Sequence, residues 1–232
     1  DAVVSRDRLD GHAAQPGLPA GGAPVLTLFT FDWDAEGLAR QAHRYRLLNA
    51  GFDLFSFPSN ARLLAFDLDR WVDRLAERHH GRGLVAVVSH HEQFGALAAA
   101  LLAERLRLPG TSPRAIVLCQ HKLLFRQLLE RVAPEANLPF AMLDAEYGDA
   151  PPDDLRYPLF VKPVKAAYSV LARRIEDGDA LRRHIRFGPL ETWIIRRLVR
   201  PFDQVARRLV PGCPGAHRMI VEQPVSAAQF NL

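Results

Sequence analysis

Apolar positions in the first half of the chain alternate between short β-rich runs and stretches with helical spacing. The β-rich runs are Val25–Phe31, Phe52–Phe57 and Leu84–Ser89, and the helical stretches are 34–50, Asp67–His80 and His91–Leu106. The third β-rich run is apolar nearly throughout, as in strands covered on both faces. A strand followed by a helix, three times over, predicts a small parallel sheet with right-handed crossovers.

The pattern changes at Leu108–Gly110. Ser112 is a candidate N-cap and Pro113 suits the first helical position of a stretch that carries Lys122 and runs to about Val132. Further strands are expected at Pro139–Leu143, Leu159–Val161, Ser169–Arg173, Met219–Glu222 and Gln229–Leu232, and further helices from Asp179 and across Glu191–Leu209. Short strands mixed with helices predict an α+β arrangement for this part.

These patterns predict three segments. Residues 1–24 are rich in Gly, Ala and Pro without sustained periodicity, which is typical of an irregular lead-in. Residues 25–110 are expected to form a three-layer α/β domain, and residues 111–232 a second part in which 135–232 form a small α+β lid. The chain begins with Asp1 and its last predicted strand has no partner beyond it, so we expect a fragment of a longer protein.

Composition excludes several classes of protein. The net charge is +4, from 27 arginines and 3 lysines against 26 acidic residues. The sequence has no long run of like charges that would indicate a nucleic-acid partner. Cys119 and Cys213 are far apart in sequence, which indicates a reducing cytoplasm and no disulfide framework. No apolar run approaches the roughly 18–20 residues of a membrane span. We therefore expect a cytoplasmic protein with no nucleic-acid or membrane partner; the oligomeric state is left open.

The three lysines are Lys122, Lys162 and Lys165, close together in a chain that otherwise uses arginine. A lysine is a compact charge on a flexible stem, which suits contact with phosphate oxygens. Lys162 ends an apolar run and is followed by Pro163, which stops the strand. Two interpretations stay open: an ammonium that meets an anion, as burial there would require, or one that reaches solvent at the strand end.

Four segments, in this order, resemble the front part of an ATP-grasp ligase. They are Leu108–Ala115, Cys119–Lys122, Tyr157–Pro163 and Val221–Val225 with Gln229–Leu232. The resemblance covers about residues 84–232, and more loosely 25–83. It implies a Rossmann-like pre-ATP-grasp domain followed by a partial ATP-grasp α+β nucleotide-binding domain.

The resemblance also implies roles for single residues in phosphate binding. Lys122 matches the first phosphate-contacting lysine of the family, and Lys162 matches the second, which reaches the α-phosphate and often the adenine. The segment Val164–Val170 matches the mobile lid loop over the phosphates. Within it Lys165 adds a charge, and Ser169 stands at the position of a common loop serine.

The adenine and ribose positions follow in the same way. Glu222, Gln223 and Val225 match the hinge whose backbone reads the purine edge, and Gln229 stands where an acidic residue usually holds the ribose hydroxyls. The family's magnesium ligands and its transition-state arginine would lie beyond Leu232. No metal ligand and no catalytic residue can therefore be named in this chain.

The function that the resemblance implies is ATP-dependent ligation of a carboxylate to an amine through an acylphosphate. ATP and Mg²⁺ would be the cofactors, and a small-molecule carboxylate and an amine the substrates. Two departures, a lid loop without glycine and Gln229 in place of a carboxylate, leave open a non-catalytic nucleotide-binding module. An NAD-binding protein is disfavoured, because Phe31–Gly37 lacks the Gly-x-Gly-x-x-Gly turn.

Overall fold

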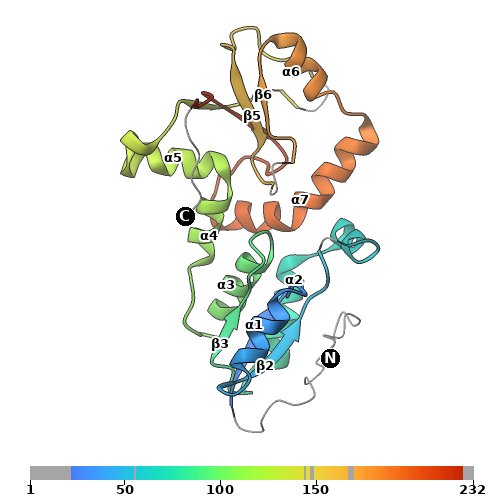
Figure 1. The fold of residues 1–232 in the computed structure, drawn as a ribbon, viewed down its shortest axis with the longest axis vertical. Helices are drawn as coiled ribbons and strands as arrows, with labels where there is room; N and C mark the ends of the chain where they lie inside the picture. Colours follow the sequence, from blue (N-terminus) through green and yellow to red (C-terminus); the bar gives the residue numbers. More distant parts are fainter. Residues whose placement is uncertain (1–21, 55, 144, 147–148, 167–169, 227–232) are drawn as a thin grey trace. The chain divides into compact units, whose positions relative to one another are not determined.

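The computed structural model describes residues 22–54, 56–143, 145–146, 149–166 and 170–226. The chain divides into two compact units. The first runs to Val117 and includes Gln204–Pro211, and the second comprises Leu118–Asp203 and the residues from Gly212 on. Helix α7 (Pro189–Leu209) therefore contributes residues to both units (Figure 1). No helix in these ranges is both long and apolar enough to cross a membrane.

The first unit is built on a three-stranded parallel sheet in the order β2-β1-β3. The strands are β1 (Ala23–Leu28), β2 (Tyr45–Ala50) and β3 (Ala86–Val88). The predicted parallel pairing of the first and third β-rich runs is confirmed. The central strand ends at Leu28 rather than at Phe31, because Phe29 has a φ of 50° and leaves the extended conformation.

Three helices accompany this sheet: α1 (Asp34–Gln41), α2 (Leu68–His79) and α3 (Gly95–Arg105) (Figure 1). The Asp67 carboxylate accepts a hydrogen bond from the Arg70 N–H and caps α2, so the helix begins at the predicted place. Leu97 and Leu101 of α3 are fully buried, and Arg105 at its end donates to Asp73 of α2. A short 3₁₀ helix, Ser59–Ala65, precedes α2.

Two predictions for this unit are wrong. The predicted helix 34–50 ends at Gln41, and its second half is β2, which pairs residue by residue with β1. Residues 52–54 and 56–57 are irregular, with bends and the start of a turn, and do not form a strand. The edge of β1 is already taken by β2, and the ring of Phe52 instead packs edge-on against Phe29 at 5.5 Å between centroids. Tertiary pairing and aromatic packing thus override the local pattern.

The second unit is built on a four-stranded antiparallel sheet in the order β4-β7-β5-β6. Its strands are β4 (Phe140–Met142), β5 (Leu159–Pro163), β6 (Arg173–Ile175) and β7 (Met219–Glu222). Its helices are α4 (Pro113–Gln120), which begins at the predicted proline and crosses the unit boundary, α5 (Lys122–Val132), α6 (Gly178–His184) and most of α7, with a 3₁₀ turn at Pro134–Ala136.

The two faces of this sheet are covered differently. One face carries an apolar core, to which Leu181 of α6 and Ile185, just after the end of α6, contribute. The other buried members of this core are Leu143, Ala145, Leu159, Val161, Ile175, Met219 and Val221. On the opposite face Ile220 packs with Val164 and with Leu123 of α5. Side chains alternate along a strand, so the second face also receives the polar residues of β5 and β7.

One strand of this unit is shifted from its predicted position. The strand expected at 169–173 begins only at Arg173, because Leu171 has a φ of 55°. Residue 169 and the strand expected at 229–232 lie outside the described residues. The prediction for β7 is confirmed at both ends.

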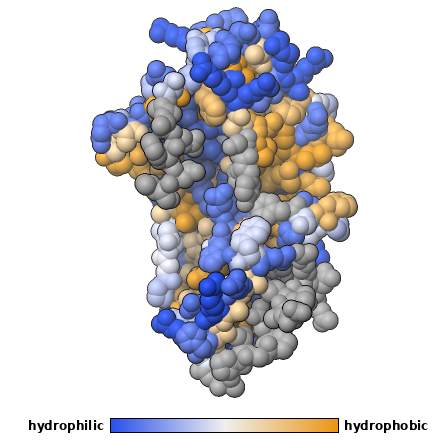
Figure 2. All heavy atoms as spheres, viewed as in Figure 1, coloured by the Kyte–Doolittle hydropathy of each residue, from blue (hydrophilic) through white to orange (hydrophobic). Residues whose placement is uncertain are grey.

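Helix α7 is amphipathic, and its two halves differ in burial. Phe202, Val205 and Ala206 in its second half are fully buried. In its first half Leu190 and Trp193 are exposed, and Figure 2 shows apolar residues on the surface over the part of the molecule where α7 begins.

A close approach in the first unit gives a test of the fold. A Cβ built on Gly95, the first residue of α3, would overlap the Ser89 hydroxyl and lie 2.9 Å from the His91 Cβ, so Gly95→Ala is expected to destabilise the protein by about 1–3 kcal/mol. A Cβ on Gly37 of α1 would meet nothing within 4 Å, so Gly37→Ala is expected to be neutral or to stabilise by roughly 0.5–1 kcal/mol. Urea unfolding of both variants checks this, and equal effects would contradict the described packing.

Candidate functional site

Charged side chains gather on the face of the second sheet that α5 covers. Phe160 pairs with Glu222 and Lys162 with Ile220 across β5 and β7, so these four residues share one face of the sheet. From α5, Lys122 and Arg126 are four residues apart and therefore lie on one side of the helix. Three elements far apart in sequence, α5, β5 and β7, thus bring opposite charges to one place.

Glu222 is the centre of this cluster. Its carboxylate receives the Lys162 ammonium at 2.6 Å on Oε2 and the Arg126 Nε at 2.8 Å on Oε1. The Glu222 side chain is only 5% exposed. Burial alone would raise the pKa of Glu222, but hydrogen bonds and charges from Arg126 and Lys162 outweigh it and hold that pKa below its ordinary value.

Arg126 is a member of the cluster that the sequence did not reveal. Besides Glu222, its guanidinium donates to the Asn137 side-chain oxygen at 3.2 Å, and the Asn137 amide donates back to the Arg126 carbonyl at 3.0 Å. The spacing of four from Lys122 on a predicted helix was the signal that could have identified it. Arg126 is therefore held in place at both its backbone and its guanidinium.

Lys122 fastens the start of the segment that follows β5. Its backbone N–H donates to the Val164 carbonyl at 3.1 Å and its ammonium to the Ala166 carbonyl at 2.8 Å. His121 caps the same helix, with Nδ1 accepting from the Leu124 N–H and Nε2 near the Pro214 carbonyl. Burial lowers the pKa of His121, which fits this capping role of a neutral ring.

The structure places Lys165 apart from this cluster. Its ammonium donates to the Gln120 side-chain oxygen at 3.2 Å and lies 5.0 Å from the centre of the Phe202 ring. The residue is buried. Lys162 and Lys165 therefore have different surroundings although they are only three positions apart.

The predicted hinge begins at Glu222, the last residue of β7, and continues beyond the strand. The Gln223 N–H donates to the Pro139 carbonyl at 3.0 Å, which extends the pairing beside β4 by one bond. The Gln223 and Val225 side chains are exposed. Ser169 and Gln229 lie outside the described residues.

The described residues do not form a metal site. No group of three or more His, Cys, Asp or Glu side chains that could hold an ion is found among them.

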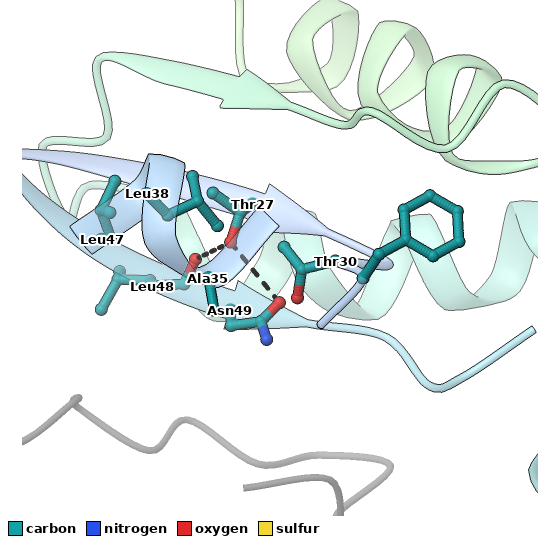
Figure 3. A pocket seen from close by; sticks show the side chains of 8 residues that line it. Thr27, Thr30, Ala35, Leu38, Leu47, Leu48 and Asn49 are labelled. Carbon is teal, nitrogen blue, oxygen red and sulfur yellow. Dashed lines mark hydrogen bonds between the residues drawn. The ribbon is translucent and has the colours of Figure 1, made fainter. Parts of the chain in front are cut away.

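A pocket in the first unit lies between α1 and the strands β1 and β2 (Figure 3). Leu38, Leu47 and neighbouring apolar side chains line it together with Thr27 and Asn49. The Thr27 hydroxyl lies 2.9 Å from the Leu48 carbonyl oxygen and 3.4 Å from the Asn49 side-chain oxygen. Because Thr27 is bonded within the protein, we assign this pocket no ligand.

Comparison with known proteins supports the fold. No protein-family model matches the sequence, and a search of curated proteins found no match. Among solved structures, an L-amino acid ligase from Bacillus licheniformis is 18% identical, with a TM-score of 0.53 over 88% of this chain and 44% of that protein. The VanG D-Ala:D-Ser ligase from Enterococcus faecalis is 12% identical, with a TM-score of 0.52 over 88% of this chain and 63% of that protein.

A D-alanine–D-alanine ligase from Coxiella burnetii is similar at 15% identity and a TM-score of 0.50, over 89% of this chain and 62% of that one. The chain thus spans less than two thirds of the length of each of these three proteins. Together they show that the chain shares the mixed α/β fold of these ligases, which is the kind of fold that its resemblance to ATP-grasp ligases implied.

The depressed pKa of Glu222 predicts how stability depends on pH. The folded state binds this proton less readily than the unfolded state, so the stabilisation is present above the ordinary pKa of 4.5 and is lost as pH falls through the lower folded value. The unfolding free energy of wild type should therefore fall more steeply below about pH 5 than that of Glu222→Gln. At neutral pH we expect the variant to be less stable by about 1–3 kcal/mol, because two cations lose their carboxylate.

Urea titrations between neutral and acidic pH measure both quantities. Glu176→Gln is the matched control, because the ion pair of Glu176 with Arg174 is solvent-exposed and should contribute within about 0.5 kcal/mol. Parallel pH profiles for wild type and Glu222→Gln would show that the carboxylate is not held as described.

Proposed function

We propose that the chain is the nucleotide-holding front part of an ATP-dependent ligase that joins a carboxylate to an amine. The observation that carries this proposal is the cluster of Arg126, Lys162 and Glu222 on an ATP-grasp fold, with Lys122 on the same helix as Arg126. Two cations share one carboxylate, so the cluster keeps a net positive charge. Such a charge favours a polyphosphate.

Lys162 is the group we assign to the phosphates. Its ammonium now pairs with Glu222, and a phosphate with more than one negative charge would compete for it. When the ammonium turns towards phosphate, Arg126 still compensates the buried carboxylate through its 2.8 Å bond. The cluster can therefore exchange one partner without leaving a buried charge unpaired.

The adenine is assigned to the hinge after β7. Gln223 and Val225 follow a buried strand and carry exposed side chains, so the backbone there lies at the surface of the unit. A purine edge pairs with backbone N–H and C=O groups in the way an added strand would. Lys122, which binds the Val164 and Ala166 carbonyls, would hold the start of the lid segment beside the phosphates.

The reaction that fits these roles has two steps. An oxygen of the substrate carboxylate attacks the γ-phosphorus of ATP, ADP leaves, and an acylphosphate forms. The amine nitrogen then attacks the acyl carbon, phosphate leaves with the bonding pair, and the amine proton passes to solvent or to a base. Gathering cations around several anionic oxygens lowers the repulsion in the first step.

The first unit would be the Rossmann-like domain that precedes the grasp fold. Its parallel sheet in the order β2-β1-β3 supports this assignment. Magnesium usually accompanies ATP in phosphoryl transfer, but the described residues offer it no ligand set, so no step is routed through the ion.

A non-catalytic nucleotide-binding module is the alternative. It is favoured by the lid segment 164–170, which has no glycine to let backbone N–H groups approach phosphate closely. Release of ADP with small carboxylates and amines, assayed on the complete protein, separates the two proposals. ATP binding without substrate-dependent ADP release would favour the module.

Replacement of Lys162 tests the phosphate assignment. Lys162→Ala removes a charge-assisted contact worth about 1.5–3 kcal/mol, which corresponds to a roughly 10- to 150-fold loss of ATP affinity. Calorimetric titration of ATP into wild type and the variant gives both dissociation constants, and thermal melts check folding.

The matched control is Lys165→Ala, because the Lys165 ammonium contacts Gln120 and Phe202 instead of the cluster. We expect it to change ATP affinity by less than about threefold. If Lys162→Ala binds ATP within twofold of wild type, Lys162 has no phosphate role and serves only to neutralise Glu222.

A further inference from the structure

The carboxyl ends of β1 and β3 form a place in the first unit where ligands commonly bind. In the order β2-β1-β3, the chain passes from β1 to β2 on one side of it. The chain then crosses β1 to reach β3 on the other side, so the strand order reverses beside β1. Open parallel sheets bind ligands outside the carboxyl ends of the strands at such a point. The segments that leave these two strand ends are residues 29–34 and 89–92.

Three aromatic rings are stacked in these two segments. Trp33 lies on Phe31 with ring centres 4.2 Å apart and planes at 14°, and Phe31 lies on His91 at 5.2 Å and 24°. His91 at the inner end is buried, whereas Trp33 at the outer end is 70% exposed. A rigid indole supported from below and left in solvent offers a large surface on which a flat molecule can stack.

A polar pair lies beside this stack. The buried Asp34, which follows Trp33 in sequence, accepts the Phe31 N–H on Oδ2 at 2.9 Å and holds the His90 Nδ1 at 2.8 Å with Oδ1. An ionised carboxylate only accepts hydrogen bonds, so Nδ1 carries the proton. The other ring nitrogen, Nε2, is not used by this bond, and the side chain is 64% exposed.

We propose that Trp33 and the His90–Asp34 pair bind a small aromatic amine. The aromatic ring stacks on the indole of Trp33, and an N–H of the amine donates to His90 Nε2. The Asp34 carboxylate and the indole face of Trp33 both attract an ammonium group. The site goes beyond nucleotide binding and would suit the amine that the proposed ligation consumes.

Binding of phenethylamine to the complete protein tests the site without ATP. A ligand-observed NMR titration should give saturable binding in the millimolar range, and phenylacetate, with the same ring and the opposite charge, should bind at least several-fold more weakly. Trp33→Ala should weaken phenethylamine binding about 3- to 10-fold, and Trp33→Phe should retain part of it. His90→Ala should cause a loss of similar size.

Trp193→Ala is the matched control, because Trp193 is also exposed but lies in the second unit beside Arg197. It should leave the phenethylamine dissociation constant unchanged. Thermal melts should agree for the Trp33 and Trp193 variants, because these side chains are exposed. For His90→Ala, which removes a partner of the buried Asp34, the melt checks that the protein is still folded at the assay temperature. Absence of phenethylamine binding up to about 10 mM, equal or tighter binding of phenylacetate, or equal effects of Trp33→Ala and Trp193→Ala would overturn the proposal. None of these outcomes bears on the ATP site.

Discussion

The buried carboxylate of Glu222 is the constraint on which the site in the second unit depends. Removing a charge of this kind from water costs several kcal/mol, and only close opposite charges offset the loss. Arg126 from α5 and Lys162 from β5 supply them at 2.8 and 2.6 Å. The same bonds hold α5 against this face of the sheet, where Leu123 of α5 also packs with Ile220 of β7. A charged group and an apolar contact thus determine one packing arrangement together.

The parts of the fold that the sequence predicted are those in which local and tertiary preferences agree. The β7 run Met-Ile-Val-Glu is buried at every position, and Asp67 caps α2 through its own carboxylate. The predictions failed where a partner strand or a backbone angle decided the outcome. Residues 45–50 have apolar spacing that fits a helix, but they pair along the whole of β1, and Leu171 delays β6 through its positive φ. Neither cause can be derived from apolar periodicity.

The resemblance named some of the residues that the structure brings together in the candidate site, but not their contacts. Motif resemblance identified Lys122, Lys162 and Glu222, and the structure brings the last two into direct contact. The resemblance did not indicate that the Glu222 side chain would contact Lys162, because hinge residues were expected to act through their backbone. Lys165 has the same side chain as Lys162 but contacts Gln120 and Phe202. Its contacts depend on where the chain turns after β5 and not on its residue type.

The choice of arginine at one position and lysine at the other follows from the physics of the two side chains. A guanidinium is a planar fork that can hold two partners in fixed directions, and Arg126 binds both Glu222 and Asn137 in this way. An ammonium on a flexible stem makes contacts without a fixed plane, so it can change partners with little loss of geometry. In a chain with 27 arginines and 3 lysines, Lys162 stands where the proposed phosphate binding requires a change of partner. Under that proposal the arginine keeps the carboxylate neutralised, and the lysine is the group that would move to a phosphate.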